Sequence, residues 1–181
     1  MALFSDEQLG LGIQQGRVDD LTLLVERYHA SLLGLLFQLT SGDRALSEDL
    51  VQETFLHVIS NISSYRYPRP FKPWLYSIAV NLARDHYKQA EFRHTGSLPV
   101  NLEIRTTATP ETELLIVEEE RQVLAAMNIL PALQREVILL RYSHDLSLRE
   151  ISQVLHVPLG TVKSRLSLGL QRLKEKIKAN P

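Results

Sequence analysis

SLREISQVLHVPLGTVKSRL, residues 147–166, decides the fold of the C-terminal part of this chain. Positions 148–155 are amphipathic at helical spacing, and Ser147 followed by Glu150 three residues later has the pattern of a capping box. A tight turn comes next, and a longer helix over 159–178 then begins with small and polar side chains. A short helix, a tight turn and a longer helix predict a helix-turn-helix unit.

The longer helix of this unit has the surface that a recognition helix needs. Small side chains keep its leading face slim enough for the DNA major groove, which is about 12 Å wide, and basic side chains can contact phosphates or bases. The predicted contact residues are Arg149, Gly160, Thr161, Lys163, Ser164, Arg165, Ser167 and Arg172. The opposite face is apolar and is predicted to be buried; it consists of Val162, Leu166, Leu170 and Leu173. An ordinary helical hairpin with a basic, solvated end is the alternative interpretation.

Helical spacing of apolar residues continues outward from this unit through most of the chain, and no alternating strand pattern of useful length occurs. The fold class is therefore predicted to be all-α. In the N-terminal part we expect helices over about 5–16, 21–41, 44–62 and 71–93 that pack as a bundle. The loop 63–70 contains two prolines, which exclude helix.

The segment 94–110 differs from its neighbours because it combines Thr, Gly, Pro and Asn with little periodicity. We predict that it is a flexible linker between two small helical domains. These are the N-terminal helical bundle, 1–93, and a C-terminal domain, 111–181, that contains the helix-turn-helix. The chain has 181 residues, 44% of them hydrophobic, which is enough for two compact cores.

Charge is distributed unevenly along the chain. The net charge is −1, yet acids outnumber bases over 1–60, whereas bases predominate over 66–93 and again over 163–178. Two basic surfaces separated by acidic ones could hold two stretches of one polyanion while another face meets a different partner. Ordinary solvated helix faces would give the same pattern, so charge alone leaves both interpretations open.

Composition disfavours several classes of function. The absence of cysteine excludes disulfides, thiolate nucleophiles and cysteine-ligated zinc. The six histidines include no His-x-x-x-His pair, and the sequence contains neither a Gly-x-Ser-x-Gly elbow nor a phosphate-binding glycine loop. We therefore expect no enzyme activity, no metal and no cofactor. No apolar run approaches the roughly 18 residues that span a bilayer, and no signal sequence begins the chain, so we expect a cytoplasmic protein without membrane insertion.

Three stretches resemble the motifs of one protein family. LPALQREVILLRY (130–142), together with the helix-turn-helix, resembles region 4 of the extracytoplasmic-function sigma factors of the sigma-70 family. EDLVQETF (48–55) resembles their region 2.2, and FKPWLYSIAVNLARD (71–85) resembles regions 2.3 and 2.4. The resemblance implies a factor that binds core RNA polymerase and directs promoter-specific transcription initiation. It would read the −35 and −10 elements and help to melt the −10 region.

The resemblance also implies roles for individual residues. The N-terminal bundle would bind the β′ clamp of the polymerase and the −10 element, and the C-terminal domain would bind the β flap and the −35 element. Polymerase contacts are expected from Asp49, Gln52, Glu53, Phe55 and Leu56. Aromatic, amide and charged side chains suit unstacked bases and their phosphates. The expected −10 contacts are Tyr65, Arg66, Tyr67, Phe71, Lys72, Trp74, Asn81, Arg84, Asp85 and Lys88.

Simpler interpretations of these residues are open from sequence alone. The acidic face of the third helix could be a solvated surface, and Phe71 and Trp74 could be core residues only. The loop 65–70 lacks the Gly-Asp-Ser that is usual in the family, and Pro73 replaces a residue more compatible with helix. The base preference at the −10 element therefore stays open.

Two other classes of protein compete with this interpretation. One is a helix-turn-helix regulator that binds a palindromic duplex as a dimer, with the N-terminal bundle as a ligand-sensing or dimerising domain. The other is an interaction protein that binds polymerase without reading DNA, which the slim, basic recognition helix disfavours. The resemblance further implies an anti-sigma factor as a partner, clamping the two domains across the linker.

Overall fold

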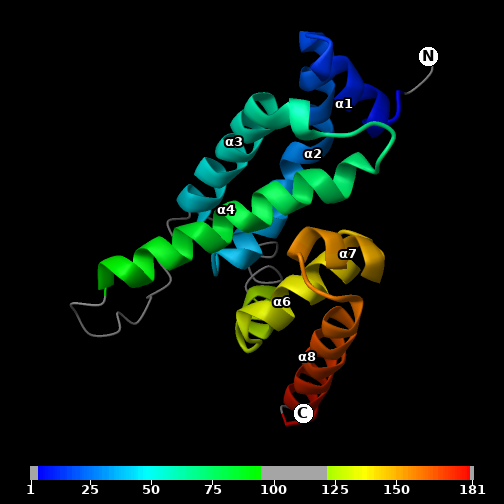
Figure 1. Cartoon of the computed structure of the whole chain (residues 1–181). Coiled ribbons are helices and arrows are strands. Elements are labelled where there is room, and N and C mark those ends of the chain that lie inside the picture. The colour runs from blue at the N-terminus through cyan, green and yellow to red at the C-terminus, as the bar shows by residue number, and fades with distance from the viewer. Residues whose placement is uncertain (1–3, 95–121, 180–181) are drawn as a thin grey trace, which may run out of the picture.

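A computed structural model describes residues 4–94 and 122–179 of the chain. Every regular element within these residues is a helix, which confirms the all-α prediction (Figure 1). The predicted linker lies outside the described residues, apart from His94, and so does the start of the predicted C-terminal domain, 111–121.

The N-terminal bundle consists of four α-helices and a short connection. They are α1 (Asp6–Gln14), α2 (Val18–Leu39), α3 (Arg44–Asn61), the 3₁₀ turn η1 (Ile62–Ser64) and α4 (Phe71–His94). The helices α2, α3 and α4 pack against one another, and α1 packs on α2 (Figure 1). The capping box at the start of α1 is present: Ser5 N donates to Gln8 Oε1 at 2.8 Å, and Gln8 N donates to Ser5 Oγ.

Buried leucines from α2 fill the centre of this bundle, and aromatic side chains close one end of it. Leu32, Leu35 and Leu36 have no exposed surface. At the closed end, the ring of Tyr65 meets the ring of Phe71 edge-on with centroids 5.1 Å apart. Burial of large apolar side chains is the main source of stability in such a bundle.

The described part of the C-terminal domain consists of a helix over 122–128, α6 (Ala132–Ile138), η2 (Leu139–Ser143), α7 (Leu148–Leu155) and α8 (Leu159–Ala179). The helix-turn-helix is formed by α7 and α8. The predicted capping box at α7 is confirmed, since Ser147 N donates to Glu150 Oε2 at 2.8 Å and Glu150 N donates back to Ser147 Oγ. The turn passes through His156 in the left-handed region, with a φ of 53°.

The packed face of α8 differs at one position from the prediction. Val162 is buried as expected, but Leu170 is 39% exposed and Gly169 is buried in its place. An ideal Cβ on Gly169 would lie 2.6 Å from Ile138 Cδ1, so the missing side chain lets α8 approach α6 closely. The face of α8 that packs on α6 therefore includes Gly169, and Leu170, the next residue, points outward.

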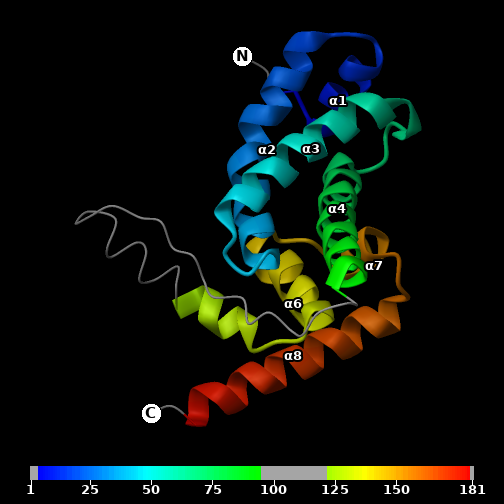
Figure 2. The same ribbon diagram turned by 90° about the vertical axis from the view of Figure 1, so that its left-hand side faces the viewer.

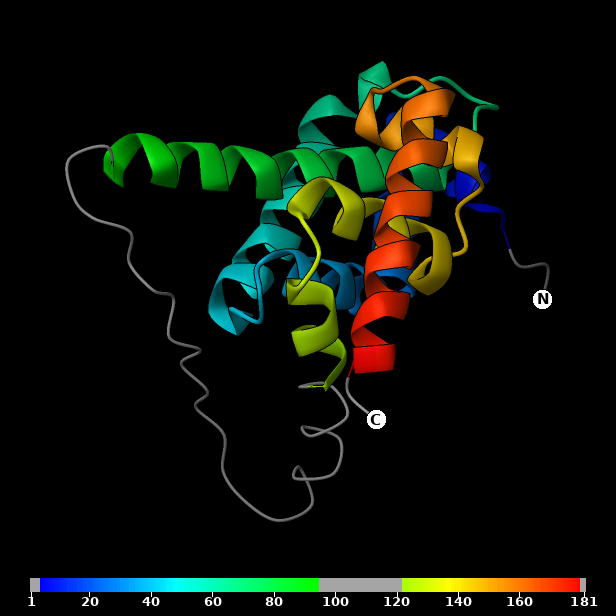
Figure 3. The same cartoon turned by 90° about the horizontal axis from the view of Figure 1, so that it is seen from below.

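The two domains are packed against each other. Helix α7 lies against α4, and α6 lies against the end of α2 (Figure 2). Viewed from below, α8 crosses the direction of α4 and extends away from the N-terminal bundle (Figure 3). This compact arrangement, called the closed arrangement below, determines which of the predicted site residues are accessible.

Candidate nucleic-acid interface

Helix α8 presents the leading face predicted for a DNA reader. Gly160, Lys163, Ser164 and Ser167 are exposed, and nothing lies within 4 Å of an ideal Cβ on Gly160. Arg149 on α7 is exposed too, and Thr161 is half-buried. This surface lies opposite the packed Val162 and Gly169, so a duplex could approach it without disturbing the domain core.

Two of the predicted basic contacts on α8 have neighbours within the protein. Arg172 is exposed and donates from Nη1 to Gln134 Oε1 at 3.1 Å. Arg165 is half-buried, and its Nη1 atom is fully buried without a hydrogen-bond partner among the described residues. In the closed arrangement Arg165 therefore faces the interior of the molecule more than the solvent.

Three of the four aromatic residues predicted to hold −10 bases, Tyr65, Phe71 and Trp74, lie in the core or pack against it. Tyr65 is 3% exposed and Phe71 is fully buried, and Trp74 is half-buried with its ring centroid 5.4 Å from that of Phe71. Burial raises the pKa of Tyr65 to about 12. Tyr65 and Phe71 therefore cannot stack on a base in this arrangement, because their rings already pack on each other.

The other predicted −10 residues divide into accessible and engaged groups. Arg66, Tyr67, Asp85 and Lys88 are exposed, and Asn81 is half-buried. Lys72 and Arg84 are half-buried, and both are bound by the C-terminal domain.

Arg84 on α4 and Glu136 on α6 form an ion pair that joins the domains. Arg84 Nε donates to Glu136 Oε1 at 2.7 Å, and Arg84 Nη2 donates to Glu136 Oε2, so the pair is bidentate. The Glu136 side chain is only 6% exposed. The hydrogen bonds to this carboxylate raise the pKa of Arg84. Bidentate pairs of this kind fix geometry as well as charge.

His144, in the loop after η2, forms the second contact between the domains. Its Nδ1 lies 3.1 Å from Tyr76 Oη and 3.2 Å from Ser31 Oγ, and Lys72 Nζ donates to its backbone oxygen at 2.6 Å. Burial, with a smaller effect from the Lys72 ammonium, lowers the pKa of His144 to about 4. The imidazole is therefore neutral at neutral pH.

The end of α7 and the loop that precedes α4 line one hollow together. A hollow of about 620 Å³ is lined by Arg66, Arg69 and Trp74 from the N-terminal domain and by Gln153 and His156 from the helix-turn-helix. A partner that enters this hollow meets both domains at once.

The predicted polymerase-binding face on α3 is open apart from one residue. Asp49, Gln52 and Glu53 are exposed, and Leu56 is 61% exposed. Phe55 is 8% exposed and packs in the core, since it points to the inner side of α3. The exposed set therefore forms a partly acidic surface with an apolar residue at one end.

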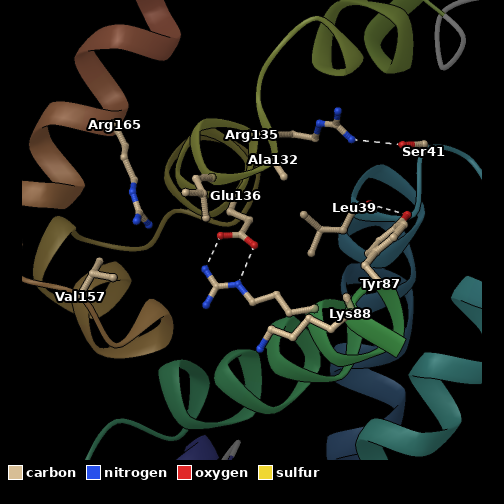
Figure 4. A pocket seen from close by; sticks show the side chains of 12 residues that line it. Leu39, Ser41, Tyr87, Lys88, Ala132, Arg135, Glu136, Val157 and Arg165 are labelled. Atoms are coloured by element: carbon tan, nitrogen blue, oxygen red, sulfur yellow. Dashed lines mark hydrogen bonds and ion pairs between the residues drawn. The ribbon is translucent and has the colours of Figure 1, made fainter. Parts of the chain in front are cut away.

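A cavity of about 660 Å³ lies between the two domains beside the Arg84–Glu136 pair (Figure 4). We call it the interdomain cavity. Its N-terminal wall includes Leu39, Tyr87 and Lys88, and its C-terminal wall includes Arg135 and Arg165.

Comparison with known proteins gives matches for both domains. The family model for sigma-70 region 2 matches residues 24–93, and that for sigma-70 region 4 matches residues 120–173. The ECF RNA polymerase sigma-E factor of Haemophilus influenzae is 34% identical over 96% of this chain and 95% of its own length. The ECF RNA polymerase sigma factor SigW of Bacillus subtilis is 31% identical over 92% of this chain and 93% of its own. This chain belongs to the extracytoplasmic-function sigma factors of the sigma-70 family.

Solved structures agree with this sigma factor in fold. RpoE of Bartonella quintana, crystallised with the anti-sigma factor NepR, superposes with a TM-score of 0.68 and 25% identity over 90% of this chain and 99% of that chain. CnrH, solved in complex with the cytosolic domain of CnrY, gives a TM-score of 0.76 at 22% identity over 97% of this chain and 99% of that one, which shows a shared fold.

Family membership decides between the competing classes. The sigma factor recognises promoters, and its region 4 contains the helix-turn-helix. Its relatives are transcription initiation factors. Among residues 4–94 and 122–179, no helix is both long enough and apolar enough to cross a bilayer. Roles of single residues in DNA or polymerase contact stay predictions.

Glu136 and His144, which bind Arg84 and Lys72 across the two domains, were not among the residues predicted from the sequence. Glu136 directly precedes the apolar run Val137–Leu140, which suggests a buried position. A carboxylate at such a position normally needs a cationic partner, and this was the sign in the sequence. His144 had no comparable sign, because the residues around it are polar. The sign at Glu136 does not identify its partner, Arg84.

Proposed function

We propose that this sigma factor binds core RNA polymerase through the exposed face of α3, reads the −35 element with α8, and reads and helps to melt the −10 element with the surface of α4 and its preceding loop. The observation that carries the −35 assignment is the slim, basic, solvent-facing side of α8 opposite its packed side. That geometry suits the major groove.

We also propose that the closed arrangement must open before a promoter is read. Lys72 and Arg84, both expected at the −10 element, are engaged by the C-terminal domain, and Arg165 faces the interdomain cavity. A side chain bound within the protein cannot bind DNA at the same time. Opening would release these cations together.

Transcription with purified core polymerase tests the proposal. The chain should direct initiation from a promoter selected from its host genome. Lys163→Ala should weaken binding of the holoenzyme to that promoter. It should also reduce the salt slope of the logarithm of this affinity by about one, as expected for one lost phosphate contact. Lys174→Ala, a matched loss of charge farther along α8, should leave the sequence preference unchanged. Tight binding of the free chain to a palindromic duplex, with no effect on initiation, would instead identify a dimeric regulator.

The exposed face of α3 predicts that a charge reversal there weakens binding to core polymerase. Glu53→Lys should weaken binding to core polymerase by roughly 10- to 100-fold, because it places a cation where a basic partner helix is expected. Glu26→Lys, on the exposed side of α2, makes the same charge change away from this face and should bind normally. Fluorescence anisotropy of the labelled chain with core polymerase measures both, and equal affinities would refute the assignment.

The proposal extends to an inhibitory protein partner, to action in the cytoplasm and to the absence of enzyme activity. It rests on kinship with transcription initiation factors and on RpoE, which was crystallised with an anti-sigma factor. Hollows shared by both domains offer such a partner a surface that exists only in the closed arrangement. A tagged chain that captures no inhibitor of its own transcription from the native host would contradict the partner assignment.

A further inference from the structure

The interdomain cavity has the size and the walls of a ligand site. Its volume of about 660 Å³ falls within the roughly 300–1,000 Å³ of typical small-molecule pockets. Leu39, Tyr87 and Leu133 provide apolar wall. Because both domains contribute residues, the cavity exists only while the domains are closed.

Positive charge in this cavity exceeds negative charge. Four cationic side chains line it, and the accompanying carboxylate, Glu136, is already bound to one of them, Arg84. Arg135 donates to the backbone oxygens of Met127 and Leu130 and to Ser41 Oγ, none of which carries a charge. Lys88 reaches in from α4 and forms an exposed contact with Asp85 at 3.4 Å. The cavity therefore attracts anions.

Arg165 supplies a donor without an acceptor. Its side chain extends from α8 toward Glu136 (Figure 4), and its buried Nη1 has no hydrogen-bond partner among the described residues. A buried donor of a charged group that lacks an acceptor is costly, and such groups in native proteins normally have one. An anionic oxygen placed beside Arg165 would satisfy this donor.

We propose that the interdomain cavity binds a small phosphate-bearing ligand, which holds the sigma factor closed. Arginine and lysine together suit phosphate oxygens, through planar hydrogen bonding and point charge respectively. The apolar wall would take the remainder of the ligand. Because Arg84, Lys88 and Arg165 are also expected DNA contacts, the ligand would withhold them from a promoter. This last consequence rests on the proposed function, whereas binding itself does not.

Calorimetric titration of the full chain with inorganic pyrophosphate at low ionic strength, without DNA or polymerase, tests the site. We expect saturable binding at one site and a roughly 10- to 100-fold loss of affinity in Arg165→Gln, as for a lost hydrogen bond to a charged group. Lys174→Gln removes the same charge from an exposed position on α8 outside the cavity and should bind as the unaltered chain does.

Three outcomes would overturn the proposal: no saturable binding, equal weakening in Arg165→Gln and Lys174→Gln, or binding of an Asp- and Glu-rich peptide in place of pyrophosphate, which would point to a protein partner. Circular dichroism verifies that Arg165→Gln is folded, and Lys88→Gln, at an exposed position, provides a second test that does not disturb the core. Promoter-directed initiation is measured separately, so its failure would refute the proposed function and leave this site standing.

The effect on closure has its own measurement. The chain contains no cysteine, so Glu26→Cys and Lys176→Cys, both at exposed positions, give a fluorescent pair with one label on each domain. Pyrophosphate should increase the fraction of molecules with the label distance of the closed arrangement, and Arg165→Gln should need roughly 10- to 100-fold more pyrophosphate for the same response. An unchanged distance distribution at saturating pyrophosphate would refute the ligand's role in closure.

Discussion

Glu136→Gln should separate the two domains. The change removes one charge with almost no change in shape, so it leaves the Arg84 guanidinium beside a neutral amide in a largely buried site. Removing one partner of a buried ion pair typically costs roughly 3–5 kcal/mol. Arg84 keeps 25% of its side chain exposed, so we expect a value near the lower end of that range. The ratio of closed to open molecules should then fall by about 100-fold.

The Glu26→Cys and Lys176→Cys label pair measures this change as a shift away from the label distance of the closed arrangement. Glu48→Gln is the matched control, because it disrupts the exposed pair of Arg44 and Glu48, and such surface pairs contribute only about 0–1 kcal/mol. Exchanging the partners, with Arg84→Glu and Glu136→Arg together, should restore part of the closure. A Glu136→Gln protein that stays closed would show that apolar packing between α4 and α7 holds the domains without the ion pair.

Opening by Glu136→Gln has a functional consequence. If closure competes with promoter binding, the variant should bind promoter DNA more tightly than the unaltered chain at equal core polymerase concentration. Since Glu136 lies on α6 and belongs to neither predicted DNA surface, a gain of binding would come from the released Lys72, Arg84 and Arg165. This separates an effect on closure from a direct loss of contact.

Local features of this fold could be predicted from the sequence because their causes lie within a few residues. The capping boxes at Ser5 and Ser147 and the turn before α8 depend on side chains three or four positions apart. The contacts between the domains could not be predicted in this way. Arg84 is 52 residues from Glu136, and Ser31 is 113 residues from His144, so nothing local pairs them.

The aromatic −10 candidates show a different limit of prediction from sequence. Tyr65, Phe71 and Trp74 have flat apolar rings, and the same rings suit either an unstacked base or a protein core. The sequence therefore predicts that these rings pack against flat or apolar groups, but it does not show whether those groups are bases or other core side chains. The structure places Tyr65 and Phe71 in the core, which leaves the exposed Arg66, Tyr67 and Lys88 and the half-buried Asn81 as the accessible candidates.

Acid should also open the molecule, through His144. In the closed arrangement burial and Lys72 hold its pKa at about 4, whereas an exposed histidine has a pKa of about 6.5. The open form therefore binds a proton more readily than the closed form. The stabilisation of closure by neutral His144 is complete above about pH 6.5 and is lost as pH falls toward 4. Within that window the ratio of closed to open molecules should fall by about tenfold for each pH unit.

The groups around His144 also favour opening of the domains in acid. Lys72 and Tyr76 face it from α4 and Ser31 faces it from α2, while Asp145, its chain neighbour, acts in the opposite sense by favouring the charged imidazole. A protonated His144 would lie beside the Lys72 ammonium, and its Nδ1 would lose the ability to accept from Tyr76 or Ser31. Both effects disfavour closure.

Distance measurements on the labelled chain between pH 7.5 and 5 test this prediction against two histidine variants. His144→Asn cannot titrate in this range, so its closed fraction should vary little with pH. His57→Asn, at an exposed position on α3, should keep the full dependence. The same pH response in both variants would show that another group opens the domains. A flat response in the unaltered chain would mean that His144 stays buried after opening, since only a histidine that reaches solvent on opening links the proton to the movement.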